Sequence, residues 1–214
     1  LYNFAEYGVP QFRERILFVG IRIDTGFDFI HPLPTHGPNG KYPYVTAGDA
    51  LVGAKDVPYN NELINIKEKT RKMLEMIPEG GNFRDIPEES PYHVKGMISH
   101  VYRRIKLDEP AKTIIAAGGG GTWGYHYPEP RPLTNRERAR LQSFPDDFIF
   151  GGSVTEVRRQ IGNAVPPEGV RLVARRLIPL FTGEYEHIDL MPEYEKMKNM
   201  TVKERLEYVT SQMN

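Results

Sequence analysis

Three helix starts lie between residues 131 and 182, and they restrict the fold of this chain more than any other feature. Thr134 is followed three residues later by Glu137, and Ser153 by Glu156. This spacing is typical of a capping box, in which each side chain bonds to a backbone N–H of the first turn. Pro167 suits the first turn of a third helix, where no backbone N–H is needed. The sequence therefore predicts three successive helices.

The third of these helices is expected to bury one face. Apolar residues recur at helical spacing from Val170 to Phe181, a pattern that predicts a stripe packed against the protein. A last, charged helix is expected between Glu193 and Gln212.

The first half of the chain gives weaker signals. The apolar run from Ile16 to Ile21 predicts a buried strand. Residues 62–77 predict a helix that ends before Pro78, and residues 97–117 predict two strands joined across 108–110. The Pro- and Gly-rich segments between these elements, 24–44 and 78–91, are expected to be loops.

The composition is that of an ordinary soluble protein, for which a cytoplasmic location is expected. The chain of 214 residues contains no cysteine, which excludes disulfides, thiolate metal sites and a cysteine nucleophile. Its six histidines are scattered, so we expect no metal site. No apolar run is long enough to cross a bilayer.

Charge is unevenly distributed, although the formal net charge is zero. Residues 131–176 hold nine arginines against five acidic residues, whereas residues 183–214 hold seven acidic residues against four Lys or Arg. A basic middle and an acidic tail therefore cancel in the sum. The basic middle is compatible with nucleic-acid binding and equally with an ordinary solvated surface.

Three short segments carry the most specific patterns. The first runs from Gln11 to Arg15 and reads Gln-Phe-Arg-Glu-Arg. Side chains two apart in an extended segment project from the same side, so Gln11, Arg13 and Arg15 are expected to converge. Paired guanidinium groups suit a carboxylate, a phosphate or a base edge, and a surface ion-pair cluster is the plainer alternative.

The second and third segments follow much later, at residues 131–146 and 160–167. They read Arg-Pro-Leu-Thr-Asn-Arg-Glu-Arg-Ala-Arg-Leu-Gln-Ser-Phe-Pro-Asp and Gln-Ile-Gly-Asn-Ala-Val-Pro-Pro. In this order the three segments resemble the last three conserved motifs of DNA (cytosine-5) methyltransferases. By itself the second is a well-capped helix, and the third is a helix-to-helix connector.

The resemblance implies roles for individual residues. Arg15 is expected to reach a flipped cytosine and Arg13 to brace the catalytic site. Asn163 and Val165 are expected to contact S-adenosyl-L-methionine, the methyl donor of the family. The expected DNA-binding residues are Gln11, Thr113, Gly119, Gly120, Gly121, Arg136 and Arg140.

The implied fold is α/β, namely the C-terminal part of a Rossmann-like S-adenosylmethionine-dependent methyltransferase plus a small mixed target-recognition domain. On this basis residues 1–22 end the catalytic domain and residues 23–130 form the target-recognition region. Residues 131–182 form motif-bearing helices that return to the catalytic domain, and residues 183–214 form a charged helical tail.

The implied function is DNA methylation at carbon 5 of cytosine, as in restriction–modification systems. The family reaction needs a cysteine thiolate that adds to a flipped cytosine, and this chain has no cysteine. We therefore expect the chain alone to be inactive, with its partners being double-stranded DNA and an N-terminal catalytic half. The start at Leu1 suggests an excised piece or a split subunit, and the isolated half is expected to self-associate.

Two other hypotheses remain at this point. The chain could be a non-catalytic, sequence-specific DNA-binding protein derived from the same family, although such a protein has no use for the cofactor-side segment 160–167. An unrelated α/β scaffold would require three ordered matches to be accidental. The resemblance places the residues that select the DNA sequence in the variable segment 24–100, whose residues follow no code that names the recognised bases.

Overall fold

The computed structural model describes residues 1–95, 100–116, 122, 124–187 and 195–212. The chain divides into two compact units. Unit 1 contains residues 1–17 and 33–172, and unit 2 contains residues 18–32 and 173–214. Each unit is described by itself below.

Unit 1 begins with a short antiparallel pair of strands. Strand β1, Tyr2–Asn3, pairs with β2, Glu14–Arg15, with Tyr2 opposite Arg15. The 3-10 helix η1, Phe4–Tyr7, follows β1, and Gly8 ends it in the left-handed region at φ 84°. Phe4 is fully buried, so this turn is fixed from inside.

The buried strand expected at residues 16–21 is not present. The described residues include only the β1–β2 sheet, and β2 ends at Arg15. Ile16 is 64% exposed and Phe18 is 94% exposed. A strand is stabilised by hydrogen bonds to a neighbouring strand, and in the described chain no strand is paired with this run.

Short helices lie at intervals along the chain between residues 23 and 85. Their bounds are η2 Ile23–Thr25, α1 Ala47–Leu51, η3 Ala54–Asp56, α2 Glu68–Glu75 and η4 Phe83–Asp85. The helix expected at residues 62–77 is therefore real but shorter. It begins at Glu68 because the preceding Lys67 is in an extended conformation and supplies no side-chain cap.

One apolar core of unit 1 includes buried residues of α2 and η4. It is formed by Met73, Leu74, Ile77, Phe83, Ile86, Val101 and Tyr125. The two strands expected at residues 97–117 do not form among the residues described there, which are 100–116; the isolated bridges from Gln11 to Ala111 and from Arg104 to Tyr125 take their place. These segments pair with distant parts of the chain rather than with each other.

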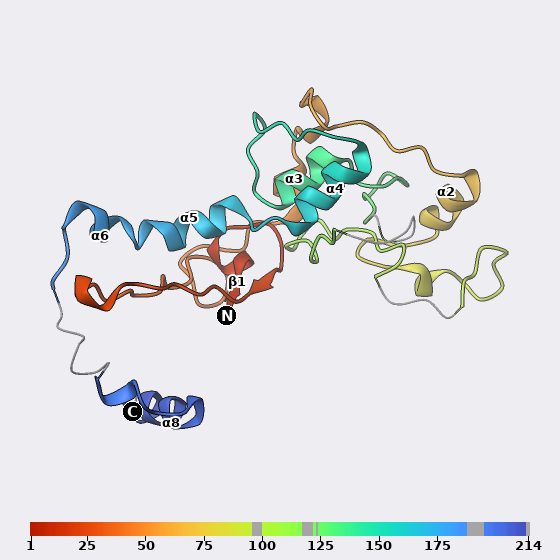
Figure 1. Cartoon of the computed structure of the whole chain (residues 1–214). Coiled ribbons are helices and arrows are strands. Elements are labelled where there is room, and N and C mark those ends of the chain that lie inside the picture. Colours follow the sequence, from red (N-terminus) through yellow and green to blue (C-terminus); the bar gives the residue numbers. More distant parts are fainter. Residues whose placement is uncertain (96–99, 117–121, 123, 188–194, 213–214) are drawn as a thin grey trace. The chain divides into compact units, whose positions relative to one another are not determined.

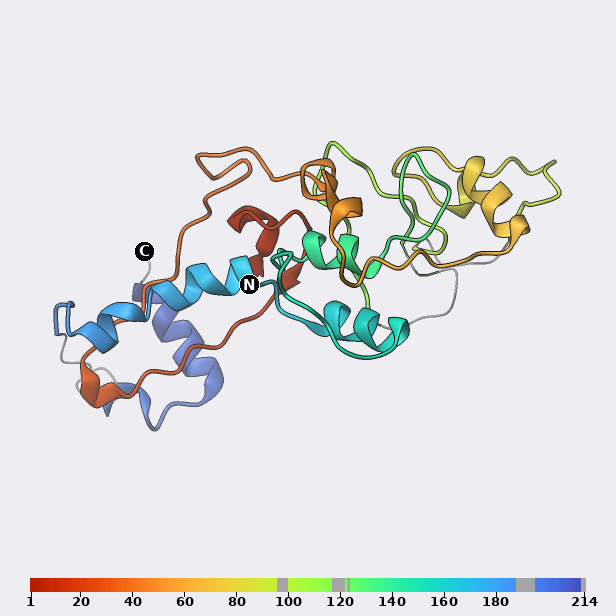
Figure 2. The same ribbon diagram turned by 90° about the horizontal axis from the view of Figure 1, so that it is seen from above.

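The three predicted helix starts are confirmed. Helix α3, Asn135–Leu141, begins at Thr134 and α4, Val154–Asn163, begins at Ser153, each with both bonds of a capping box. Helix α5 is Pro167–Arg175. Figures 1 and 2 show α3 and α4 side by side. Their apolar faces enclose a second core that includes Leu133, Leu141, Val157 and Ile161.

Unit 2 joins two distant segments of the chain. The Tyr185 hydroxyl donates to the main-chain oxygen of Thr25 at 2.8 Å, and its ring packs edge-on against Phe27 at 5.0 Å. Helix α6, Ile178–Thr182, is separate from α5, so the single helix expected to reach Phe181 is broken after Arg175. Pro179 in the first turn of α6 fits a new start there.

The charged tail forms α8, Val202–Gln212. It is shorter than the expected helix, whose start at Glu193 lies outside the described residues. No helix in the described part of the chain is long and apolar enough to span a membrane.

Candidate functional site

Arg13 connects three segments that are far apart in the sequence. Its buried guanidinium group donates to the main-chain oxygens of Ile114 at 3.0 Å, Gly162 at 2.7 Å and Ala164 at 3.0 Å, and it approaches Gln11 Oε1 at 3.4 Å. Burial, and then the neighbouring cation of Arg15, lower the pKa of Arg13 to about 10. The group therefore stays charged at neutral pH.

Gln11 lies beside Arg13 and is fully buried. Its Nε2 donates to the Leu141 oxygen at 3.1 Å, and its Oε1 accepts the Ile114 N–H at 2.9 Å. Both ends of the amide are thus bonded to the protein main chain. The expected contact between Gln11 and DNA does not fit this position, because the side chain does not face solvent.

Gly162 allows the connector after α4 to lie directly against the main chain. A Cβ atom at this position would sit 2.3 Å from the Ala116 backbone, closer than any side chain tolerates. The oxygens of Gly162 and Ala164 then face Arg13. The connector and the Gln11–Arg15 segment are consequently held together, which neither pattern shows when read alone.

Asn163 and Val165 have the opposite orientation. Both are exposed, and Val165 retains 42% of its surface. An exposed amide beside an exposed apolar side chain can offer polar and apolar contacts to a ligand. The two residues expected to contact the cofactor therefore lie on the surface of unit 1.

Arg15 and Thr113 line one open hollow together with Phe12 and Lys112. Arg15 is half-buried, whereas Lys112 and Thr113 are exposed. The Thr113 hydroxyl donates to the Phe12 oxygen at 2.7 Å, which ties the segment after Pro110 to the Gln11–Arg15 segment. The structure thus brings together two of the expected site residues that lie far apart in the sequence.

Arg136 and Arg140 are bonded to the protein rather than extended into solvent. Arg136 is fully buried and donates to the oxygens of Tyr59, Pro145 and Phe148 at 2.8–3.1 Å. Arg140 pairs with Asp146 at 2.6 Å and also donates to main-chain oxygens before α3. The expected DNA contact of Arg136 is not compatible with this burial. The guanidinium group of Arg140 is engaged by the carboxylate of Asp146.

Glu137 lies at the centre of a charged network that its sequence pattern, a capping box, does not predict. Both of its oxygens accept from Arg131 at 2.8 Å, and its Oε2 also accepts the Thr134 N–H. Burial lowers the pKa of Arg131, but the bonds to Glu137 and Glu129 outweigh this effect and hold it above its ordinary value. The occurrence of Arg131 and Glu137 six residues apart in one segment is the sequence signal that could have indicated this ion pair.

His126 lies beside this network, with Nε2 3.8 Å from Glu137. Burial and the Arg131 cation lower its pKa. The glycines expected to contact DNA, Gly119, Gly120 and Gly121, lie outside the described residues. Within the described residues, no group of three His, Cys, Asp or Glu side chains could hold a metal ion.

Comparison with known proteins shows the family to which the chain belongs. The family described as C-5 cytosine-specific DNA methylase matches residues 1–179. The chain belongs to this family. The matched region covers the Gln11–Arg15 segment, α3, α4 and the connector between α4 and α5.

Two curated type II methyltransferases are similar to this chain over nearly its whole length. The type II methyltransferase M.NgoFVII of Neisseria gonorrhoeae is 65% identical over 209 residues, which are 96% of this chain and 56% of that protein. The type II methyltransferase M.BbvI of Brevibacillus brevis is 45% identical over 98% of this chain and 56% of its own length. The chain thus spans little more than half the length of these relatives.

A solved structure supports the methyltransferase fold. It is described as a putative DNA modification methyltransferase encoded within an E. coli prophage, and it superposes with a TM-score of 0.54 at 23% identity. The match covers 85% of this chain and 59% of that one.

Proposed function

We propose that this chain is the target-recognition and cofactor-closing part of a DNA (cytosine-5) methyltransferase. It binds duplex DNA around a flipped cytosine and contributes the C-terminal part of a Rossmann-like domain. The observation that carries this proposal is the set of Arg13 bonds to Ile114, Gly162 and Ala164. These bonds unite the Gln-x-Arg-x-Arg segment, the end of the recognition region and the cofactor-side connector.

In this proposal Arg15 contacts the flipped base and Thr113 lies near the DNA backbone. The hollow that both residues line is open to solvent and has a volume of about 520 Å³, so a nucleotide can approach it. A flipped base is required because the reacting atom is inaccessible within the stack. Arg13 acts as a positioning residue, since its donors are engaged by the main chain.

S-adenosyl-L-methionine fits the exposed pair at the connector. Asn163 supplies an amide for the polar part of the cofactor, and Val165 supplies an apolar surface. When bound, the cofactor supplies the methyl group. Gly162 sets the close approach that holds this connector in place.

The cysteine nucleophile must come from another polypeptide segment. The reaction needs a thiolate, and none of the 214 residues is cysteine. We propose that a catalytic N-terminal half supplies it and covers the exposed run from Ile16 to Ile21. A non-catalytic DNA-binding protein is the second candidate, but the Arg13-braced connector with its exposed Asn163 favours the enzyme.

The test is methyl transfer from radiolabelled S-adenosylmethionine to cytosine-containing duplex DNA. The chain alone is expected to transfer no methyl group. Mixed with the remaining part of the N. gonorrhoeae relative, which contains the residues this chain does not match, it is expected to restore transfer. Arg15→Met should abolish transfer by the mixture, whereas the control Arg84→Met, at an exposed position in η4, should not.

Two results would overturn the proposal. Transfer by the chain alone would contradict the assignment of the nucleophile to another segment. Duplex DNA binding without transfer in the mixture, while the intact relative is active in the same assay, would instead support the non-catalytic binding protein.

A further inference from the structure

Ser143 has a backbone conformation that serine rarely adopts. It directly follows Gln142, which ends α3, and its φ of 60° lies in the left-handed region that favours glycine. Its N–H donates to the Arg140 oxygen at 2.8 Å, and the N–H of Phe144 donates to the Ala139 oxygen at 2.9 Å. These two bonds complete the end of α3, and glycine at this position would form both without strain. The backbone therefore gives no reason for a serine here.

The side chain of Ser143 reaches the start of α5. Its hydroxyl oxygen accepts the N–H of Glu168 at 3.1 Å, across 25 residues of sequence. A helix normally receives such a bond from the residue that precedes it. In α5 that residue is Pro166 and the first helical residue is Pro167, and a proline side chain has no oxygen that could accept a bond. The cap of α5 is consequently supplied by Ser143, at the end of another helix.

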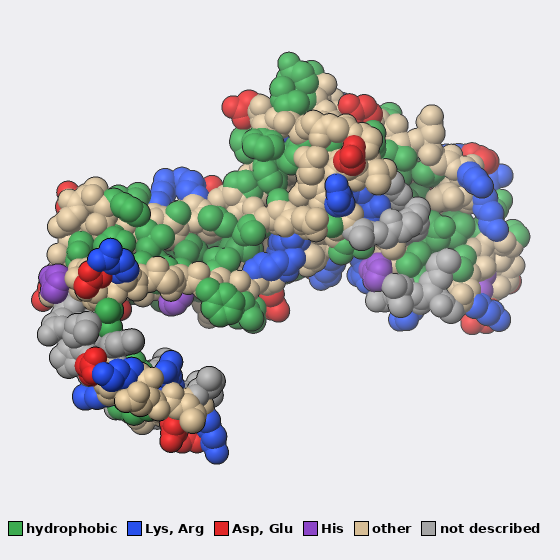
Figure 3. All heavy atoms as spheres, viewed as in Figure 1, with side chains coloured by type: hydrophobic (Ala, Val, Ile, Leu, Met, Phe, Trp, Pro, Cys, Tyr) green, Lys and Arg blue, Asp and Glu red, His purple; other side chains and the backbone are tan. Residues whose placement is uncertain are grey.

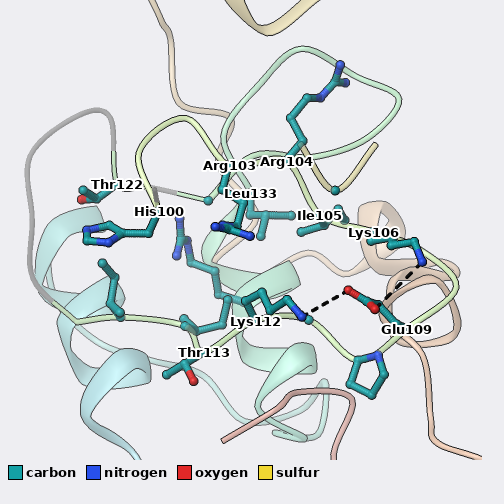
Figure 4. A pocket seen from close by; sticks show the side chains of 17 residues that line it. His100, Arg103, Arg104, Ile105, Lys106, Glu109, Lys112, Thr113, Thr122 and Leu133 are labelled. Carbon is teal, nitrogen blue, oxygen red and sulfur yellow. Dashed lines mark ion pairs between the residues drawn. The ribbon is translucent and has the colours of Figure 1, made fainter. Parts of the chain in front are cut away.

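The opposite end of the segment between α4 and α5 is held by Arg13, which donates to the Gly162 and Ala164 oxygens. The chain around Arg13 is itself bonded in place. Figure 4 shows the side chain of Thr113 pointing away from the other labelled residues, and its hydroxyl donates to the Phe12 oxygen at 2.7 Å. The segment therefore has one support at Arg13 and a second at the start of α5.

Two prolines make the segment between these supports stiff. Pro166 and Pro167 fix their own φ angles, and each restricts the conformation of the residue before it. A displacement of Glu168 is therefore passed on to Val165 instead of being absorbed by rotation of the chain. Val165 and Asn163 are the two exposed residues that the proposed function assigns to the cofactor.

Apolar packing alone does not fix the start of α5. A Cβ atom at Gly169 would lie 2.2 Å from the Phe4 ring, so the helix rests directly on this buried side chain. Apolar contacts have no preferred direction, whereas a hydrogen bond depends on the angle at its donor. The bond to Ser143 thus adds the directional contact that packing on Phe4 lacks.

We propose that Ser143 is a positioning residue for S-adenosyl-L-methionine: its hydroxyl holds the start of α5 so that Asn163 and Val165 keep the orientation that the cofactor meets. The inference rests on the proposed function, in which this pair contacts the cofactor. Ser143 acts through its bond to Glu168 and needs no contact with the cofactor. The strained backbone of Ser143 is then the cost of a bond that glycine cannot make.

The first test measures exchange of the Glu168 amide hydrogen in the 214-residue chain by NMR. Ser143→Gly relaxes the turn and removes the hydroxyl, whereas Ser143→Thr keeps a hydroxyl in a strained turn. Exchange at Glu168 should be faster by roughly two- to tenfold in Ser143→Gly, the equivalent of one neutral hydrogen bond, and close to the wild-type rate in Ser143→Thr. The Val157 amide, bonded to the Ser153 oxygen in α4, should exchange equally in all three proteins.

The second test separates cofactor binding from stability. Binding of S-adenosyl-L-methionine is measured by calorimetry, without DNA, in the mixture with the remaining part of the N. gonorrhoeae relative. Affinity should fall roughly two- to tenfold for Ser143→Gly and be retained by Ser143→Thr, although Ser143→Gly should unfold at the higher temperature of the two. In the transfer assay the loss should appear in KM for the cofactor, with kcat nearly unchanged.

Ser90→Ala is the matched control, because the Ser90 hydroxyl also accepts a main-chain N–H, that of Tyr92 at 3.1 Å, and lies outside α3, α5 and the segment between α4 and α5. It should change neither Glu168 exchange nor cofactor affinity.

Three results would overturn the positioning role. They are unchanged Glu168 exchange in Ser143→Gly, equal losses of cofactor affinity in Ser143→Gly and Ser90→Ala, and an affinity that follows stability and falls only in Ser143→Thr. Absence of cofactor binding in the wild-type mixture would instead overturn the proposed function, together with the role that rests on it.

Discussion

Arginine side chains hold much of unit 1 together by donating to main-chain oxygens. Arg13, Arg104 and Arg136 are buried, and each bonds to at least three such oxygens. A guanidinium group suits this task because it has five donors in a fixed plane and no acceptor. The sequence shows an arginine but not the carbonyls that surround it. For this reason Arg136 was expected on the DNA-binding surface and lies in the interior.

Replacement of Arg13 tests this structural role. Arg13→Met should lower the free energy of unfolding by at least about 3 kcal/mol, because hydrogen bonds to a charged group contribute roughly 1.5–3 kcal/mol each and three main-chain oxygens lose their donor. Urea unfolding followed by circular dichroism measures the change. Arg159→Met, at an exposed position of α4, should change it by less than about 0.5 kcal/mol. Equal losses in the two variants would contradict the role assigned to Arg13.

The helices of the last third were predictable because their signals are local. A capping box involves residues three apart, and both boxes form. The strands expected at 16–21 and 97–117 do not form among the residues described there, because a strand depends on a partner that its own sequence does not specify. Residues near 111 and 125 pair instead with Gln11 and Arg104.

The two capping boxes should differ in energy. The Thr134 hydroxyl accepts the Glu137 N–H and also donates to Asn61 at 2.7 Å in a buried setting, whereas Ser153 is exposed. Thr134→Ala should cost about 2 kcal/mol and Ser153→Ala about 0.5–1 kcal/mol. Thermal and urea unfolding of the two variants compare them directly. A larger loss for Ser153→Ala would show that burial of the cap does not matter here.

The whole molecule exposes apolar surface that a compact protein of this size normally buries. Phe18, Ile30, Ile178 and Phe181 are all more than half exposed, and Figure 3 shows hydrophobic side chains reaching the surface over α5 and α6. Such patches mark interaction sites or promote association. The run at 16–21 alternates exposed and half-buried residues and belongs to no strand of the described chain.

A charge placed in this run should reduce self-association. Phe18→Lys puts a cation at a residue that is 94% exposed, and charges in exposed strands oppose edge-to-edge pairing. Sedimentation velocity at increasing protein concentration should show a smaller associated fraction than for the wild type. The control Leu63→Lys, at a residue that is 68% exposed and lies outside this run, should leave association unchanged. A monomeric wild type, or an equal effect of both variants, would refute this expectation.

The sequence by itself determined the family of this chain, the starts of its three motif helices and the absence of a cysteine nucleophile. These properties reside in short local patterns or in composition, so no spatial information is needed to find them. Only the tertiary structure decided that Gln11, Arg13 and Arg136 face inward while Arg15, Asn163 and Val165 face outward. The reason is physical: the orientation of a buried polar side chain is set by the donors and acceptors that the fold places around it, and for Arg13 the acceptors Gly162 and Ala164 are far away in the sequence.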